Sequence, residues 1–241
     1  MEVITLIDAV LFDLDGTLLP MDYEGFIQTY MGLLGGYMEE YGYEPRRLVQ
    51  TVWEGTKAMA VNDGSKTNEE VFWDVFRETF GPRADTDREL FEEFYAGAFG
   101  KTRTACGFDP ASAELVHWLK DQGVRVVLAT NPLFPRVATV QRIRWAGLDP
   151  QDFELVSTFE DFRHCKPNPD YYREVLEKLD LDPAKCVMVG NDGVEDVAAT
   201  QAGLEVFLLE GCLLHPEKAA ASGCAMGDME KLKGFLQEKL R

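Results

Sequence analysis

The sequence has few cysteines, and they are not arranged for disulfides or for zinc. Cys106, Cys165, Cys186, Cys212 and Cys224 are odd in number. None of them forms a C-x-x-C pair, the spacing typical of zinc sites. This pattern argues against a disulfide framework and against a zinc centre. We interpret the five residues as reduced thiols, which predicts a cytoplasmic protein.

Long hydrophobic runs and basic residues are also scarce. No stretch approaches the roughly 20 apolar residues that a membrane-spanning helix needs, and residues 1–4 lack the basic region of a signal peptide. Lys and Arg number 24 against 42 Asp and Glu, so the formal net charge is −18. Such a chain is a poor partner for nucleic acid or an anionic membrane. An anionic substrate stays possible, because a bound metal ion and a few basic groups can reverse the local potential.

The sequence does contain a regular alternation of short apolar runs and helical patterns. Its 241 residues, 46% of them hydrophobic, can build one sizeable core and a smaller second domain. The predicted strands are 9–12, 124–129, 153–156, 185–190 and 206–209. The predicted helices between or after them are 115–119, 137–145, 170–179, 194–202 and 229–240. This order predicts an α/β fold with a doubly wound parallel sheet, the last helix packing on its outside.

Residues 21–100 break this alternation. Aromatic and aliphatic residues recur there at helical spacing, which predicts a bundle of about four helices inserted after the first strand. Thr67 and Glu70 form a candidate capping box for the third of them. We interpret the aromatic stripes as bundle core and not as a ligand site. The predicted domains are therefore a core of 1–20 and 101–241 and a helical cap of 21–100.

The first candidate site motif follows the first predicted strand. Asp13 and Asp15 are two residues apart, so both side chains project to the same side of an extended backbone. Gly16 permits a sharp turn after them, and Thr17 can brace it. Two close carboxylates can hold a metal ion, or one can act as nucleophile while its neighbour transfers protons.

Three further segments carry polar side chains at predicted strand ends or helix starts. Thr130 and Asn131 could bind the oxygens of an anion, and Lys166 could offset carboxylate repulsion. The segment 190–196 supplies acidic groups of the kind that bind magnesium. Each segment also has an ordinary interpretation as a turn, a solvated lysine or a helix cap. Ligands in open parallel sheets bind beyond the carboxyl ends of the strands, so the combination favours a site.

The four segments resemble the haloacid dehalogenase superfamily, in its phosphatase branch, in their order, spacing and strand context. The similarity runs from about residue 10 to 209, and the helical insert occupies the position of that superfamily's all-helical cap. The resemblance implies a Mg²⁺-dependent phosphohydrolase that acts on small phosphorylated metabolites. It implies that Asp13 is the nucleophile that becomes an aspartyl-phosphate. It also implies that Asp15 transfers protons and ligates the metal through its carbonyl.

The same resemblance implies roles for the other segments. Thr130, the N–H of Asn131 and Lys166 would hold the phosphoryl oxygens. Asp13, Asp15 and Asp192 would form the Mg²⁺ site, and Asp196 would orient Lys166 or a bound water. Many relatives have an Asp directly after the glycine of the last motif, where this chain has Asn191. Either residue 191 or residue 192 could therefore be the ligand, and we prefer Asp192 for its full charge.

Several questions stay open from the sequence. A phosphomutase of the same fold and a non-catalytic binding protein are the alternatives, whereas Asp15 and the acidic cluster disfavour a dehalogenase. Lys57, Asn62, Asp63 and Lys66 surround a turn in the cap and are candidate substrate contacts. His117, His164 and His215 are interpreted as surface or packing residues, and Arg142 and Arg144 as a solvated helix face. The sequence does not predict the oligomeric state or the particular substrate.

Overall fold

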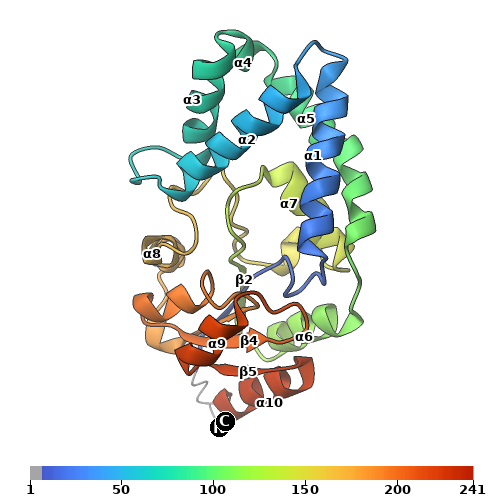
Figure 1. Ribbon diagram of the computed structural model, residues 1–241. Coiled ribbons are helices and arrows are strands. Elements are labelled where there is room, and N and C mark those ends of the chain that lie inside the picture. The colour runs from blue at the N-terminus through green and yellow to red at the C-terminus, as the bar shows by residue number, and fades with distance from the viewer. Residues whose placement is uncertain (1–6, 241) are drawn as a thin grey trace.

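The computed structural model describes residues 7–240, so the prediction about a signal peptide in residues 1–4 concerns residues outside this range. Five parallel strands form one sheet in the order β2-β1-β3-β4-β5. They are β1 (Ala9–Phe12), β2 (Arg125–Leu128), β3 (Cys186–Gly190), β4 (Glu205–Leu209) and β5 (Ala225–Gly227). The predicted α/β fold with a parallel, doubly wound sheet is confirmed (Figure 1).

Helices cover both faces of this sheet, because alternate side chains of each strand point to opposite sides. Val10 and Phe12 belong to a cluster with α6 (Pro110–Asp121), α7 (Arg136–Trp145) and α10 (Met229–Lys239). Ala9 and Leu11 belong to a cluster with α8 (Pro169–Leu179), η4 (Val197–Ala202) and α9 (Pro216–Ser222). The prediction that the last helix packs on the outside of the sheet is therefore correct. Two short 3-10 helices, η2 (Pro150–Asp152) and η3 (Pro183–Lys185), complete the core.

Three predicted elements differ from the structure. The segment 153–156 lies beside β2 and exchanges backbone hydrogen bonds with Val126 and Leu128, but it forms only an isolated bridge, Leu128 to Val156, and not a strand. Residues 225–227 form β5, although Ala-Met-Gly carries no strand signal. The helix expected over 194–202 is a 3-10 helix that begins at Val197. Its start is delayed because the preceding turn folds around the Asp196 carboxylate.

The inserted region is helical, as predicted. It comprises α1 (Tyr23–Glu39), α2 (Pro45–Ala60), α3 (Asn68–Phe80), α4 (Arg83–Thr86), α5 (Arg88–Ala96) and the 3-10 helix η1 (Ala98–Ala105). Thr67 and Glu70 form the predicted capping box. Most of the aromatic stripe is core, but this prediction is wrong for Tyr41 and Trp53, which are 39% and 47% exposed. The domain boundaries at residues 21 and 100 stay a prediction.

The sheet topology positions the candidate site. The first strand, β1, lies between β2 and β3, and Phe12 lies opposite Leu128 of β2 and Val189 of β3. The chain passes from β1 to β2 on one side and then crosses back to β3 on the other side of β1. A topological switch point therefore lies at the carboxyl ends of these strands. Asp13, Thr130 and Asn191 follow these three strands within two residues. In residues 7–240, no helix is both long and apolar enough to cross a membrane.

Candidate active site

A buried lysine joins two carboxylates at the carboxyl edge of the sheet. The Lys166 Nζ donates to Asp13 Oδ1 at 2.8 Å and to Asp196 Oδ1 at 2.7 Å. All three residues are buried, and Lys166 is only 2% exposed. Burying an ammonium group is costly unless charged partners and hydrogen bonds compensate it. The arrangement therefore fixes Asp13 and Lys166 against each other.

Asp196 anchors this pair to the turn after β3. Its Oδ2 accepts hydrogen bonds from the backbone N–H of Asn191 and of Asp192, both at 2.9 Å. The turn approaches Gly190 so closely that a Cβ there would lie 2.0 Å from Asp196 Oδ2. A glycine is therefore required at position 190. Asp196 contacts Lys166 directly, and its role in orienting Lys166 or a bound water stays a prediction.

The glycine of the first motif is explained by its contact with Asn191. Gly16 has φ of +88°, and a Cβ on it would lie 2.3 Å from Asn191 Nδ2. The Asn191 Oδ1 accepts from the Thr17 hydroxyl at 3.0 Å, and its Nδ2 donates to the carbonyl of Cys212 at 2.7 Å. The oxygen and the nitrogen of this amide therefore connect the loop after β3 to the loops that contain Thr17 and Cys212.

The carboxylate of Asp192 makes hydrogen bonds within its own turn and also lies at the site. Asp192 Oδ1 accepts from the N–H of Val194 at 2.7 Å and of Glu195 at 3.1 Å. His215 Nδ1 lies 2.8 Å from the same oxygen. Asp192 thus closes the turn before η4 and does not cap that helix, which begins at Val197 after Asp196. The residue also lines the cavity that contains Asp13.

Thr130 and Asn131, the two polar residues after β2, approach the site from the side opposite the segment after β3. Thr130 is 3% exposed, and its carbonyl accepts from the hydroxyls of Ser157 and Tyr171. Asn131 Oδ1 accepts from the backbone N–H of Lys166 at 3.2 Å, and its Nδ2 donates to Glu195 Oε1 at 3.0 Å. These bonds connect the loop after β2 to Lys166 and to the segment after β3.

Arg142 is a site residue that sequence reasoning missed. The prediction of a solvated face is correct for Arg144 but wrong for Arg142, which is 0% exposed. Its Nη1 forms an ion pair with Asp15 Oδ2. Sequence alone cannot separate the two arginines, because both lie on α7 and only the fold shows which one faces Asp15.

A cavity of about 90 Å³ lies at this edge of the sheet, and five acidic side chains line it: Asp13, Asp15, Asp192, Glu195 and Asp196. Burial raises the pKa of Asp13 to about 7, and Lys166 opposes this while Asp196 and Asp15 add to it. Burial also raises the pKa of Glu195 to about 8, against the effect of Lys166 and with that of Asp196, Asp192 and Asp13. Burial and the neighbouring acids therefore outweigh Lys166 at both groups, so each pKa lies above its usual value.

This donor set fits a divalent cation in its chemistry. Asp13, Asp15 and Asp192 offer the oxygen ligands that Mg²⁺ prefers, and Asp15 Oδ1 is buried without a hydrogen-bond partner among the described residues. Within residues 7–240, however, no three His, Cys, Asp or Glu side chains converge into a preformed metal site. Lys166, Arg142 and His215 occupy oxygens of these carboxylates.

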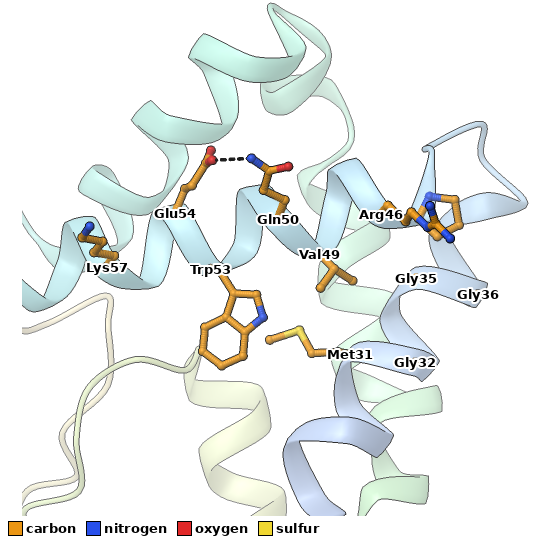
Figure 2. Close-up of a pocket in the computed structure, with 11 residues that line it drawn as sticks. Met31, Gly32, Gly35, Gly36, Arg46, Val49, Gln50, Trp53, Glu54 and Lys57 are labelled. Atoms are coloured by element: carbon orange, nitrogen blue, oxygen red, sulfur yellow. Dashed lines mark hydrogen bonds between the residues drawn. The ribbon is translucent and has the colours of Figure 1, made fainter. Parts of the chain in front are cut away.

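The candidate cap contacts differ in their surroundings. Lys57 lines a hollow of about 720 Å³ between α1 and α2, where Trp53 and Met31 project toward one another (Figure 2). Asn62 is buried and donates to the Asn68 side chain at 2.9 Å and to the Lys66 carbonyl at 3.0 Å. Asp63 is exposed. Their role in substrate binding stays a prediction.

The protein is of the α/β class with a doubly wound parallel sheet, and carboxylates cluster at the switch point of that sheet. The haloacid dehalogenase-like hydrolase family matches residues 7–203. The chain therefore belongs to this family and is an enzyme, a hydrolase. The resemblance of its motifs to the haloacid dehalogenase superfamily is thus confirmed.

Similar proteins agree with this assignment. The chain is 27% identical over 208 residues to the pyrophosphatase PpaX of Bacillus mycoides, covering 86% of this chain and 85% of that protein. It is 33% identical over 144 residues to a phosphoglycolate phosphatase of Cupriavidus necator, covering 59% and 60%. A structure described as a putative beta-phosphoglucomutase from Thermotoga maritima has a TM-score of 0.59 at 21% identity, covering 96% and 99%. That last likeness shows the fold alone.

Proposed function

We propose that the protein is a Mg²⁺-dependent phosphohydrolase of small phosphorylated metabolites that works through an aspartyl-phosphate on Asp13. The observation that carries this proposal is the buried Lys166, which joins Asp13 to Asp196 beside Asp15. A carboxylate held by a lysine in a small acidic cavity suits attack on phosphorus. The names of PpaX and of the phosphoglycolate phosphatase support phosphate release as the reaction.

In the first step, an oxygen of Asp13 attacks the phosphorus atom and the bond to the leaving oxygen breaks. Lys166, Thr130 and the N–H of Asn131 are proposed to hold the phosphoryl oxygens as charge moves in the transition state. Asp15 gives its proton to the leaving oxygen. In the second step, the oxygen of a water molecule attacks the phosphorus of the aspartyl-phosphate while Asp15 accepts a proton from that water. The bond between the Asp13 oxygen and phosphorus breaks, so inorganic phosphate leaves and the Asp13 carboxylate is restored.

The proposed metal ligands are Asp13, the carbonyl of Asp15, and Asp192. A bound Mg²⁺ would supply positive charge against the phosphoryl oxygens. We favour Asp192 over Asn191 because the amide of Asn191 is already bonded to Thr17 and Cys212. Asp192 also carries the full charge that a hard cation prefers.

The rest of the substrate is proposed to lie along the side of α1 that runs from Tyr23 toward Gly35. Tyr23, Ile27, Met31 and Gly35 recur every four residues and so share one face of this helix. Tyr23 lines the catalytic cavity, and Met31 and Gly35 line the hollow with Trp53. At 1.5 Å per residue, Met31 lies about 12 Å along the helix from Tyr23. This mostly apolar face favours esters whose alcohol part is apolar.

A panel of small phosphate compounds tests the proposal. It contains phosphoglycolate, inorganic diphosphate and aryl and alkyl phosphates, and inorganic phosphate is measured with Mg²⁺ and with EDTA. We expect release that requires Mg²⁺ and that falls by roughly 10³-fold or more in Asp13→Asn, because an amide is a poor nucleophile. Asp8→Asn is the matched control, since Asp8 precedes the same strand and is partly exposed.

Two outcomes would contradict the proposal. No release from any compound with any metal would direct attention to phosphomutase assays or to a binding role. Release that persists in EDTA and in Asp13→Asn would mean that the reaction occurs elsewhere. The described contacts contain no feature that favours the mutase or the non-catalytic alternative.

A further inference from the structure

Arg142 is a buried charged residue whose position is not explained by packing alone. Its side chain is 1% exposed, and the guanidinium lies over the ring of Phe134, 4.4 Å from the centroid. Its Nη2 donates to Thr139 Oγ1 at 3.3 Å, whereas Nε is buried without a partner among the described residues. An apolar side chain of similar volume packs a core at least as well as a buried ion pair. Stability alone therefore does not account for the charge.

The pairing with Asp15 is asymmetric. Arg142 Nη1 contacts Oδ2 of the carboxylate, whereas Oδ1 is buried and takes no hydrogen bond from residues 7–240. Asp15 lines the cavity with Asp13, and so does Phe134. Arg142 is not among the lining residues of that cavity in the described part of the chain. Any effect of Arg142 on a bound ester would therefore pass through Asp15, with which it is paired, or through Phe134, over which it lies.

We propose that Arg142 is a positioning residue that holds Asp15 Oδ2 and thereby directs Oδ1 at the leaving oxygen of the substrate. This inference rests on the proposed phosphohydrolase function. The guanidinium is planar and always charged, so its contact fixes the plane of the carboxylate as well as its distance. The stacked ring of Phe134 and the hydroxyl of Thr139 keep the guanidinium itself in place.

The step that Arg142 would assist is the transfer of one proton. As the Asp13 oxygen bonds to phosphorus, the electron pair of the P–O bond moves to the leaving oxygen. The proton on Asp15 moves to that oxygen, so the products are an alcohol, an Asp15 carboxylate and the aspartyl-phosphate. A leaving group that is stable as an anion needs this proton little, and a poor leaving group needs it most.

The test is the dependence of kcat/KM on the leaving group in Arg142→Met. Substituted phenyl phosphates, from nitrophenyl to methoxyphenyl, keep the shape similar while the leaving group becomes poorer. We expect kcat/KM of the variant to fall at least about tenfold more for the methoxyphenyl than for the nitrophenyl ester. Arg144→Met on the same helix is the matched control and is expected to keep the wild-type profile, because Arg144 is exposed.

A second arm separates positioning from packing. Asp15→Asn should show the same steep profile, and adding Arg142→Met to it should cause little further loss, because both act on one proton transfer. Should Arg142→Met fail to fold, Arg142→Lys replaces it and is expected to show a smaller change of the same kind.

An equal loss for every ester, or additive losses in the double variant, would overturn the role of Arg142. The proposed function fails separately, if the wild-type protein releases no phosphate or if Asp13→Asn retains the activity.

Discussion

At the scale of single residues, Gly16 offers a test of how the first motif is held. Its φ of +88° costs an alanine about 1 kcal/mol, and the new Cβ would also lie 2.3 Å from Asn191 Nδ2. We expect Gly16→Ala to lower the free energy of unfolding by about 2 kcal/mol and to lower kcat by displacing the Asp15 loop. Urea unfolding and phosphate release measure the two effects.

Gly123 is the matched control for this substitution. Its φ is +78°, but nothing lies within 4 Å of the position of a Cβ. Gly123→Ala should therefore lose only the conformational part of the stability and keep full activity. Equal effects of the two substitutions would show that the contact between Gly16 and Asn191 is unimportant.

Some of the site residues could be predicted from the sequence, because local patterns mark them. Asp13 and Asp15 follow a strand directly, and a glycine turn comes next, so both the position and the chemistry are visible in five residues. Arg142 carries no such mark, because it meets Asp15 across 127 positions of sequence. Only tertiary packing turns its face of α7 toward the site.

At the scale of elements, the start of α3 attaches the helical insert to the core. The N–H groups of Asn68 and Glu69 donate to the carbonyls of Phe162 and Phe159 at 2.8 and 2.9 Å. The buried Asn68 Nδ2 donates to the carbonyls of Pro132 and His164, each at 3.3 Å. These residues flank Asn131 and Lys166, so the first turn of α3 supports both loops of the site.

We expect Asn68→Ala to lower the free energy of unfolding by about 1–3 kcal/mol, because it leaves buried carbonyls without a donor. Activity should also fall, since the loops that hold Asn131 and Lys166 lose a common support. Asn62→Ala removes the partner of Asn68 Oδ1, and the double variant should lose less than the sum of the two. Strictly additive losses would contradict a coupled pair.

How well each strand can be predicted from the sequence depends on its position in the sheet. Strands buried on both faces, such as β1 and β3, appear as continuous apolar runs and were predicted within a residue or two. Two elements at the ends of the sheet differ from the prediction. The segment 153–156 has an apolar pattern but forms no strand beside β2, and β5 forms a strand beside β4 without an apolar pattern. Pairing at an edge depends on the partner strand more than on local sequence.

At the scale of the whole molecule, the net charge of −18 and the acidic cavity lead to a prediction about metal binding. A ligand that binds only the folded state at about ten times its Kd stabilises it by roughly 1.4 kcal/mol. We expect Mg²⁺ to raise the unfolding free energy by about this amount in the wild-type protein and by much less in Asp192→Asn. NaCl of matched ionic strength separates site binding from the screening of surface charge. An equal effect of NaCl, or an unchanged response in Asp192→Asn, would mean that Mg²⁺ acts on the overall charge and not at this site.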